Sequence, residues 1–205
     1  MGQLDFQPSE ILRAVKSFAE CSQGTQLNRY EVQQEDEGAI EVKVIQARDI
    51  EFLKVHTYQK KQFFNKKKIG RYQLALNDIL VTSRTDQLLT SVVTEDFVDS
   101  VASQNIIVIR LDEHIVDPIF FAGLLRSRIG QHIASTAYKQ SGFQRLLTIK
   151  EFNEVKFPIP SMEVQKKLAC LFGAVSQAAC NMHDVINKRE ALVEDILIEV
   201  LGVKQ

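Results

Sequence analysis

Cysteine is scarce in this chain of 205 residues, which contains only Cys21, Cys170 and Cys180. None of them belongs to a CxxC pair, and an odd number of cysteines argues against a disulfide framework. Long hydrophobic runs are also missing: there is no apolar stretch of about 18 residues and no signal-peptide pattern. We therefore expect a cytoplasmic protein that does not enter a membrane. Its cysteines on the C-terminal helix should serve as small apolar fillers.

Motifs for catalysis and cofactor binding are missing too. The sequence has no glycine-rich nucleotide loop and no GxSxG elbow, and its four histidines are not spaced as metal ligands. Glu41-Val42-Lys43 has the E-x-K spacing of metal-dependent nucleases, but an alternating strand often produces this spacing by chance. The upstream aspartate that such a site requires is not identifiable. We expect neither an enzyme nor a cofactor or metal bound by this chain.

The C-terminal part of the chain carries the strongest pattern. From Ser161 to about Gly202, apolar residues recur at alternating steps of three and four, which is the heptad period of a coiled coil. A helix of this extent is about 60 Å long, so a second helix is needed to cover its seam. We define this heptad seam as Val164, Leu168, Leu171, Val175, Ala178, Met182, Val185, Leu192 and Ile196.

Charge is balanced over the whole chain but locally uneven. The formal net charge of −1 is unusual for a stand-alone nucleic-acid binder, yet basic residues gather between positions 60 and 71. Salt limits the reach of distant acidic groups to about 10 Å, so such a cluster can still contact phosphates. A solvated lysine loop is the alternative interpretation. The cluster consists of Lys60, Lys61, Lys66, Lys67, Lys68 and Arg71.

Before the long helix, the sequence predicts one mixed α/β (α+β) domain over residues 1–158. Residues 159–205 then form a spacer or dimerisation helix. Within the domain we expect a helix over residues 9–20, after Ser9 as N-cap, and another from Asp117-Pro118 through Ile133. A capping box, Thr148-x-x-Glu151, predicts a third, short helix.

Strands are expected where apolar residues alternate or run together. Residues 39–52 favour a strand followed by a turn, and residues 72–82 favour two strand pieces around an Asn77-Asp78 turn. The near-continuous apolar run 105–111 is typical of a central strand. The remaining predictions are strand and loop over 91–101, a polar loop over 135–144, and a short edge strand or extended arm over the proline-containing segment 155–160.

Four stretches, taken in order, resemble the DNA specificity subunit of type I restriction-modification systems. They are KVIQARDI (43–50), LALNDILVTSRTDQ (74–87), SQNIIVIRLDEHIVDPIFFAGLLRSRIGQHI (103–133) and LLTIKEFNEVKFPIPSMEVQKKLACLF (146–172). The fourth is the most specific, because it leads directly into the heptad helix. The chain departs from the family pattern at Asn77, where glycine is usual, and at Val164-Gln165, where Glu-Gln is more common.

The resemblance implies a target recognition domain that reads double-stranded DNA, joined to a spacer helix. Subunits of this family usually carry two such domains and two helices, and they are not catalytic. Methyl transfer and cleavage belong to partner methyltransferase and restriction subunits, where S-adenosylmethionine, ATP and Mg are expected. The present chain, with one domain and one helix, is similar to a half-length form.

A homodimer through the heptad seam would supply the missing half. Antiparallel pairing would place one recognition domain at each end of the paired helices, and the dimer would read a split, palindromic target. Arg189 interrupts the seam at a core position, where a polar residue can fix register and orientation. We expect Arg189 to pair with an acidic group of the other chain or of the methyltransferase.

Polar loops are the expected base-reading elements, with the lysine cluster holding phosphates. The first loop follows a predicted strand, so that Arg84 could pair with guanine and Gln87 with adenine. Gly142 in the second loop would allow close backbone approach. Solvated loops are the alternative for both. The two sets are Ser83, Arg84, Thr85 and Gln87, and Lys139, Gln140, Ser141, Gly142, Gln144 and Arg145.

Two other function classes compete with this interpretation. A coiled-coil adaptor whose globular domain binds protein rather than DNA is favoured by the neutral charge and disfavoured by the order of the four motifs. A small enzyme is disfavoured by the missing catalytic motifs.

Overall fold

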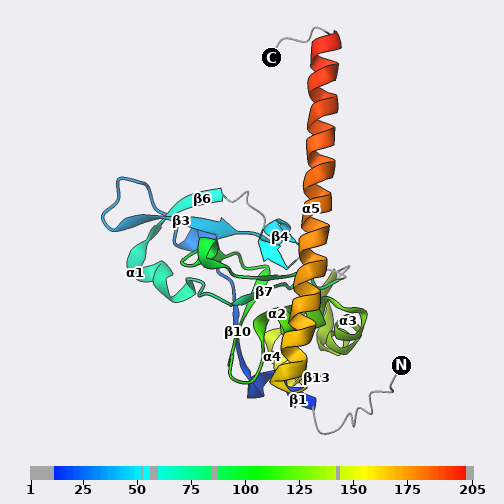
Figure 1. Ribbon diagram of the computed structural model, residues 1–205. Helices are drawn as coiled ribbons and strands as arrows, with labels where there is room; N and C mark the ends of the chain where they lie inside the picture. Colours follow the sequence, from blue (N-terminus) through cyan, green and yellow to red (C-terminus); the bar gives the residue numbers. More distant parts are fainter. Residues whose placement is uncertain (1–11, 52, 56–59, 85–86, 142–143, 202–205) are drawn as a thin grey trace.

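A mixed α/β domain is followed by one long helix, α5 (Met162–Leu201), which projects well beyond the domain (Figure 1). The computed structural model describes residues 12–51, 53–55, 60–84, 87–141 and 144–201. The expected fold class and long C-terminal helix are confirmed. Within these ranges, no helix is both long enough and apolar enough to cross a membrane.

The central sheet has four antiparallel strands in the order β2-β10-β7-β8. Its inner strand β10 pairs with β2 on one side and with β7 on the other. Ile106, Ile107 and Ile109 are fully buried, which confirms the apolar run as a central strand. The four strands are β2 (Ala19–Gln23), β7 (Ile79–Thr82), β8 (Thr90–Val92) and β10 (Ile106–Leu111).

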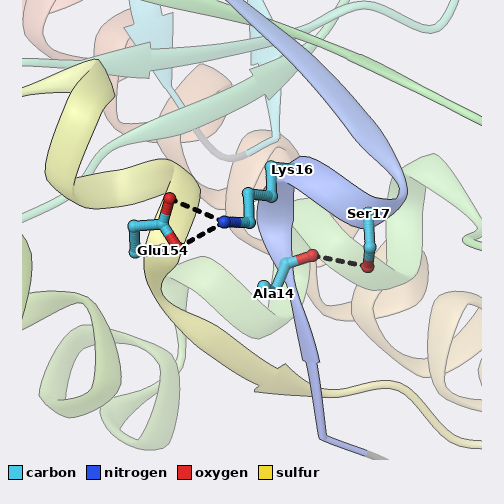
Figure 2. A network of polar contacts seen from close by, with 4 residues as sticks. All are labelled: Ala14, Lys16, Ser17 and Glu154. Carbon is cyan, nitrogen blue, oxygen red and sulfur yellow. Dashed lines mark hydrogen bonds and ion pairs between the residues drawn. The ribbon is translucent and has the colours of Figure 1, made fainter.

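The helix expected over residues 9–20 is wrong for the described part, which begins at residue 12. This segment forms β1 (Leu12–Ala14), the 3-10 turn η1 (Val15–Ser17) and the start of β2. β1 pairs antiparallel with β13 (Lys156–Pro158), which confirms the predicted edge strand. Lys16 and Glu154 join the two segments with an ion pair of 2.7 Å, as Figure 2 shows. Pairing with distant strands overrides the local helical spacing.

A second sheet has the order β6-β3-β9 and forms the part of the domain remote from the base of α5 (Figure 1). β3 pairs antiparallel with β6 and parallel with β9. The alternation that predicted β3 is confirmed, since Val42 and Val44 are buried against Phe64. The strands of this sheet and the small pair beside it are β3 (Ala39–Ile45), β6 (Lys60–Asn65), β9 (Val101–Ala102), β4 (Ile50–Glu51) and β5 (Lys54–Val55).

The helix expected from Asp117-Pro118 to Ile133 is confirmed at its start and wrong in its length. Asp117 caps α2 (Pro118–Arg126) by accepting a 2.9 Å hydrogen bond from the Phe120 amide. Ser127 then leaves the helical conformation, and its hydroxyl caps α3 (Arg128–Ala134) by accepting from the Gly130 amide. A serine side chain can form hydrogen bonds with nearby backbone groups that would otherwise bond within the helix. The chain therefore forms two helices here instead of one.

Residues 135–144 were expected to be a polar loop, but most of them are structured. η6 (Ser135–Ala137) is followed by an antiparallel hairpin of β11 (Tyr138–Ser141) and β12 (Gln144–Leu147). Thr148 caps α4 (Ile149–Glu154), as predicted. The other short elements are α1 (Lys66–Ile69) and the 3-10 turns η2 (Leu27–Arg29), η3 (Ala47–Asp49), η4 (Gly70–Tyr72) and η5 (Glu95–Phe97).

The base of α5 is anchored to α2. Gly123 of α2 lies so close to α5 that a side chain there would overlap the ring of Phe172. Gln165 is 1% exposed. Its side-chain oxygen accepts a hydrogen bond from the Asp117 backbone amide (2.8 Å), and its side-chain nitrogen donates to the backbone carbonyls of Ile115 (3.0 Å) and Pro160 (2.8 Å). This contact sets the direction in which the helix leaves the domain.

Candidate nucleic-acid interface

The predicted lysine cluster lies on β6 and α1. Lys66, Lys67 and Lys68 occupy one exposed helical turn, which the buried Ile69 anchors to the domain. Lys61 forms an exposed ion pair of 2.8 Å with Glu41, so part of its charge is balanced within the chain. The side chain of Lys60 lies outside what the structure describes. The turn of α1 therefore presents three adjacent ammonium groups, suited to phosphates rather than to base edges.

Arg71 lies at the end of this cluster, held by two tyrosines. Its guanidinium donates to the Tyr72 hydroxyl at 2.9 Å and to the Tyr30 hydroxyl at 3.2 Å, and it stacks 4.7 Å from the centre of the Tyr72 ring. The hydrogen bond between the tyrosines, together with the Arg71 charge, lowers the pKa of Tyr30. Sequence reasoning missed Tyr30, because no local signal links residues 41 positions apart.

A hollow of about 420 Å³, with polar and apolar residues in its lining, adjoins Arg71 between η4 and the face of β2 and β10. Arg110 lines it and forms a two-bond ion pair with the buried Asp78 carboxylate, at 2.8 and 2.7 Å. This hydrogen bonding raises the pKa of Arg110. Both arginines are thus held in fixed orientations at the rim of one concave surface.

The first predicted reading loop follows β7. Ser83 is only 1% exposed, which corrects the prediction that its side chain contacts DNA. Its backbone accepts from the Leu147 amide and donates to the Asn105 carbonyl, so it fixes the start of the loop. Arg84 and Gln87 are exposed, as a reading role requires. Thr85 lies outside the described residues.

The second predicted loop is the hairpin of β11 and β12. Lys139 forms an ion pair of 2.6 Å with Glu151 of α4, and this contact lowers the pKa of Glu151. Arg145 is exposed. The structure describes only the backbone of Gln140, Ser141 and Gln144, and Gly142 lies outside the described residues.

The predicted contacts fall into two groups. The bond between Leu147 and Ser83 ties the hairpin to the Arg84 loop, and Gln131 of α3 bonds the Leu88 backbone at the end of that loop. Figure 1 places α1 and α3 on opposite sides of α5. The structure therefore brings the two loops together but leaves the α1 lysines on a separate part of the domain.

The seam residues of α5 are mostly exposed. Only Val164 and Leu168, near the base, are half-buried. Ala178 and Arg189 are exposed as well. The exposed fractions of the larger apolar members are 62% for Leu171, 69% for Val175, 69% for Met182, 50% for Val185, 58% for Leu192 and 49% for Ile196. Pairing through this seam stays a prediction.

Several residues of the four motifs have structural roles. Asp49 caps η3 by accepting from the Gln46 amide at 2.8 Å. Asn77, which stands where glycine is usual, has φ of +67°, a conformation that asparagine tolerates better than most residues. The departure from the family pattern at Asn77 therefore keeps the same turn.

The structure offers no support for the E-x-K nuclease hypothesis. The Glu41 carboxylate accepts a hydrogen bond from the Lys61 ammonium, and the Lys43 ammonium donates to the Asp96 backbone carbonyl at 2.7 Å. Among the residues whose placement is described, no group of three or more His, Cys, Asp or Glu side chains could hold a metal ion.

Comparison with known proteins identifies the family. Residues 24–188 match the family model described as the type I restriction modification DNA specificity domain. The comparison with curated protein sequences finds no match. None of the similarities found points to a protein-binding adaptor.

Solved structures agree on the fold. The HsdS subunit from Thermoanaerobacter tengcongensis matches with a TM-score of 0.62 and 14% identity, over 98% of this chain and 52% of that one. The type I restriction-modification S subunit from M. genitalium matches with a TM-score of 0.60 and 12% identity, over 95% of this chain and 46% of that one. A structure described as concerning complex assembly and conformational transition of the type I R-M system matches with a TM-score of 0.54 and 13% identity. The match covers 98% of this chain and 47% of that one.

The chain thus spans about half the length of these structural relatives. The family match includes all four motif stretches and continues along α5 to residue 188. The resemblance found in the sequence is confirmed, and this chain belongs to the family of type I restriction modification DNA specificity domains.

Proposed function

We propose that the chain is the DNA-recognition subunit of a type I restriction-modification complex, working in the cytoplasm and without catalytic activity of its own. The family match over residues 24–188 carries this proposal. S-adenosylmethionine, ATP and Mg would then be bound by methyltransferase and restriction subunits. One of the related solved structures concerns assembly of such a complex, which supports partners of this kind.

The working unit in this proposal is an antiparallel homodimer. The relatives are about twice as long, so a second copy would replace their other half. The exposed seam fits this pairing, because core positions of antiparallel helices pack a against d. Several registers satisfy this rule, and we choose the one that overlaps the two copies of α5 (Met162–Leu201) over the greatest length. Leu168 would then lie opposite Leu192 of the partner subunit, and Val175 opposite its Val185. The two domains would sit at opposite ends of a rod about 60 Å long.

DNA contacts in this proposal divide by chemistry. Lys66, Lys67 and Lys68 would neutralise phosphates, while Arg84 and Arg145 would read base edges from the paired loops. The hollow beside Arg71 would receive part of the DNA backbone.

Two substitutions separate these roles. Lys66→Ala should weaken binding evenly across sequences and reduce the slope of log affinity against log salt by about 0.9, the effect of one lost phosphate contact. Arg84→Ala should relax the preference at one base pair, where a good bidentate contact discriminates by about 1–3 kcal/mol. Fluorescence anisotropy with a set of duplexes at several salt concentrations measures both.

Lys16→Ala is the matched control. Lys16 is exposed and paired with Glu154 (Figure 2), so its loss removes one positive charge that is not among the predicted contact residues. We expect Lys16→Ala to change neither the affinity nor the sequence preference. If Lys66→Ala and Arg84→Ala also change neither, the proposed contact residues are wrong.

A further inference from the structure

An apolar groove runs between α2 and α5 where the helix leaves the domain. Its volume is about 340 Å³. It is lined by Gly123 and Arg126 of α2, by Ser127 just after α2, by Leu53, and by Phe172, Val175, Ser176 and Ala179 of α5. Ser176 is 7% exposed, and its hydroxyl has no hydrogen-bond partner among the described residues. The groove is therefore an unfilled apolar surface within an otherwise packed junction.

The groove is continuous with the heptad seam. Val175 is an a position of the seam and also lines the groove, while Phe172 and Ala179 occupy the e positions beside it. Ala169 and Ser176, which face the domain, lie further round the helix and are buried. A helix paired along the seam would thus form the open wall of this groove.

The outer part of α5 carries more apolar residues than a two-stranded seam needs. Besides the seam, Ile186 and Val193 lie at e positions and are 53% and 57% exposed. A strict two-stranded coiled coil has only a and d apolar, whereas an added e row is typical of a helix with a second packing surface. Whatever packs against Ile186 and Val193 must lie on the side of the seam that carries the e positions.

Antiparallel pairing brings the row and the groove together. With Val175 opposite Val185 of the partner subunit, the residue after Val185 lies level with the stretch between Phe172 and Val175. In antiparallel pairs the e positions of the two helices flank the same side of the seam. We propose that the groove between α2 and α5 is a docking site for a second copy of this chain, and that it receives Ile186 of the partner subunit.

This inference rests on the proposed homodimer and adds a contact to it. Each domain would hold the partner's helix at the groove as well as along the seam, twice per dimer by symmetry. The groove contact would therefore bind the partner's helix to the recognition domain directly, whereas the seam binds it only to α5.

Cross-linking tests the contact directly. Arg126→Cys and Ile186→Cys are combined in the full chain with Cys170→Ser and Cys180→Ser, and a short bismaleimide is added. Cys21 remains; burial raises the pKa of its thiol to about 12, and the chain without the two added cysteines controls for its reaction. Ser176, beside the groove, lies ten residues before Ile186, about 15 Å along the helix, so a link between the two sites must join two chains.

We expect a covalent dimer from this pair, and little from the control in which Asn187→Cys replaces Ile186→Cys. Asn187 is exposed at an outward f position. A dimer by light scattering that cross-links equally through both positions, or through neither, overturns the groove contact while leaving the homodimer standing. A monomeric chain overturns both, and would leave the groove to a different protein.

A second measurement uses the dissociation constant of the dimer. Ile186→Glu should raise it roughly tenfold or more, because a charge would enter an apolar groove. Asn187→Glu, with the same charge change, should leave it within about twofold. Equal constants for the two variants would overturn the proposal, since an e position that faces only solvent tolerates glutamate.

Discussion

Gln165 is the residue on which the junction between domain and helix depends. Its side-chain amide makes one hydrogen bond as acceptor and two as donor inside a buried site, to backbone groups from two segments, the one before α2 and the one before α5. Buried backbone groups left without partners cost about 1–3 kcal/mol each. The family motif marked this position in the sequence, but only the structure explains it.

Gln165→Leu should therefore lower the free energy of unfolding by about 2–4 kcal/mol. Urea denaturation followed by circular dichroism measures this change. Lys166→Leu, at the exposed neighbouring position, is the control and should shift it by less than about 0.5 kcal/mol. Equal stabilities of the two variants would show that the three hydrogen bonds do not hold the junction.

Single residues also mark the limit of what sequence can predict about the interface. The exposure of Arg84 and of the α1 lysines could be predicted, because residue type and loop position suffice. The burial of Ser83 could not, since it depends on the backbone bond to Leu147, more than sixty positions away. Tyr30 beside Arg71 was missed for the same reason.

At the scale of elements, the packing of α2 on α5 depends on Gly123. A Cβ there would overlap the Phe172 ring, whereas a Cβ on Gly173 of α5 would meet nothing within 4 Å. Gly123→Ala should force the helices apart and lower the free energy of unfolding by about 1–3 kcal/mol. Gly173→Ala should be neutral or raise it by up to about 1 kcal/mol through helix propensity. Thermal denaturation of both variants checks this, and similar losses at both sites would contradict it.

The relative orientation of two paired α5 helices is expected to depend on Arg189. Arg189→Leu would complete the seam and should strengthen helix pairing while permitting other registers or a parallel arrangement. Distances between spin labels at the helix ends measure orientation in the variant and the parent. If the variant keeps the parent's oligomeric state and a single antiparallel orientation, Arg189 does not specify register.

Elements with a strong local signal were predictable, and those defined by distant pairing were not. β10, α2 and α5 follow from an apolar run, a capped helix start and a heptad period. The segment 12–20 has helical spacing, but β1 pairs with β13 about 140 residues later. Similarly, the hairpin β11–β12 is polar in sequence and is defined by cross-strand pairing rather than by apolar alternation.

At the scale of the whole molecule, the proposed working unit is two copies of this chain, each with one domain at the base of a long helix. The domain match, the half-length relation to the S subunits and the exposed seam all fit two copies joined antiparallel. Such a dimer would hold two identical reading surfaces in opposite directions. Its target must then repeat one half-site in inverted orientation, with the half-sites more than one turn, about 34 Å, apart.

Selection of bound duplexes from a random-sequence DNA library by the purified full chain tests this claim most directly. We predict enrichment of two identical half-sites in inverted orientation, separated by a fixed number of unspecified base pairs. Enrichment of a single half-site, of two different ones, or of no sequence at all would contradict the account.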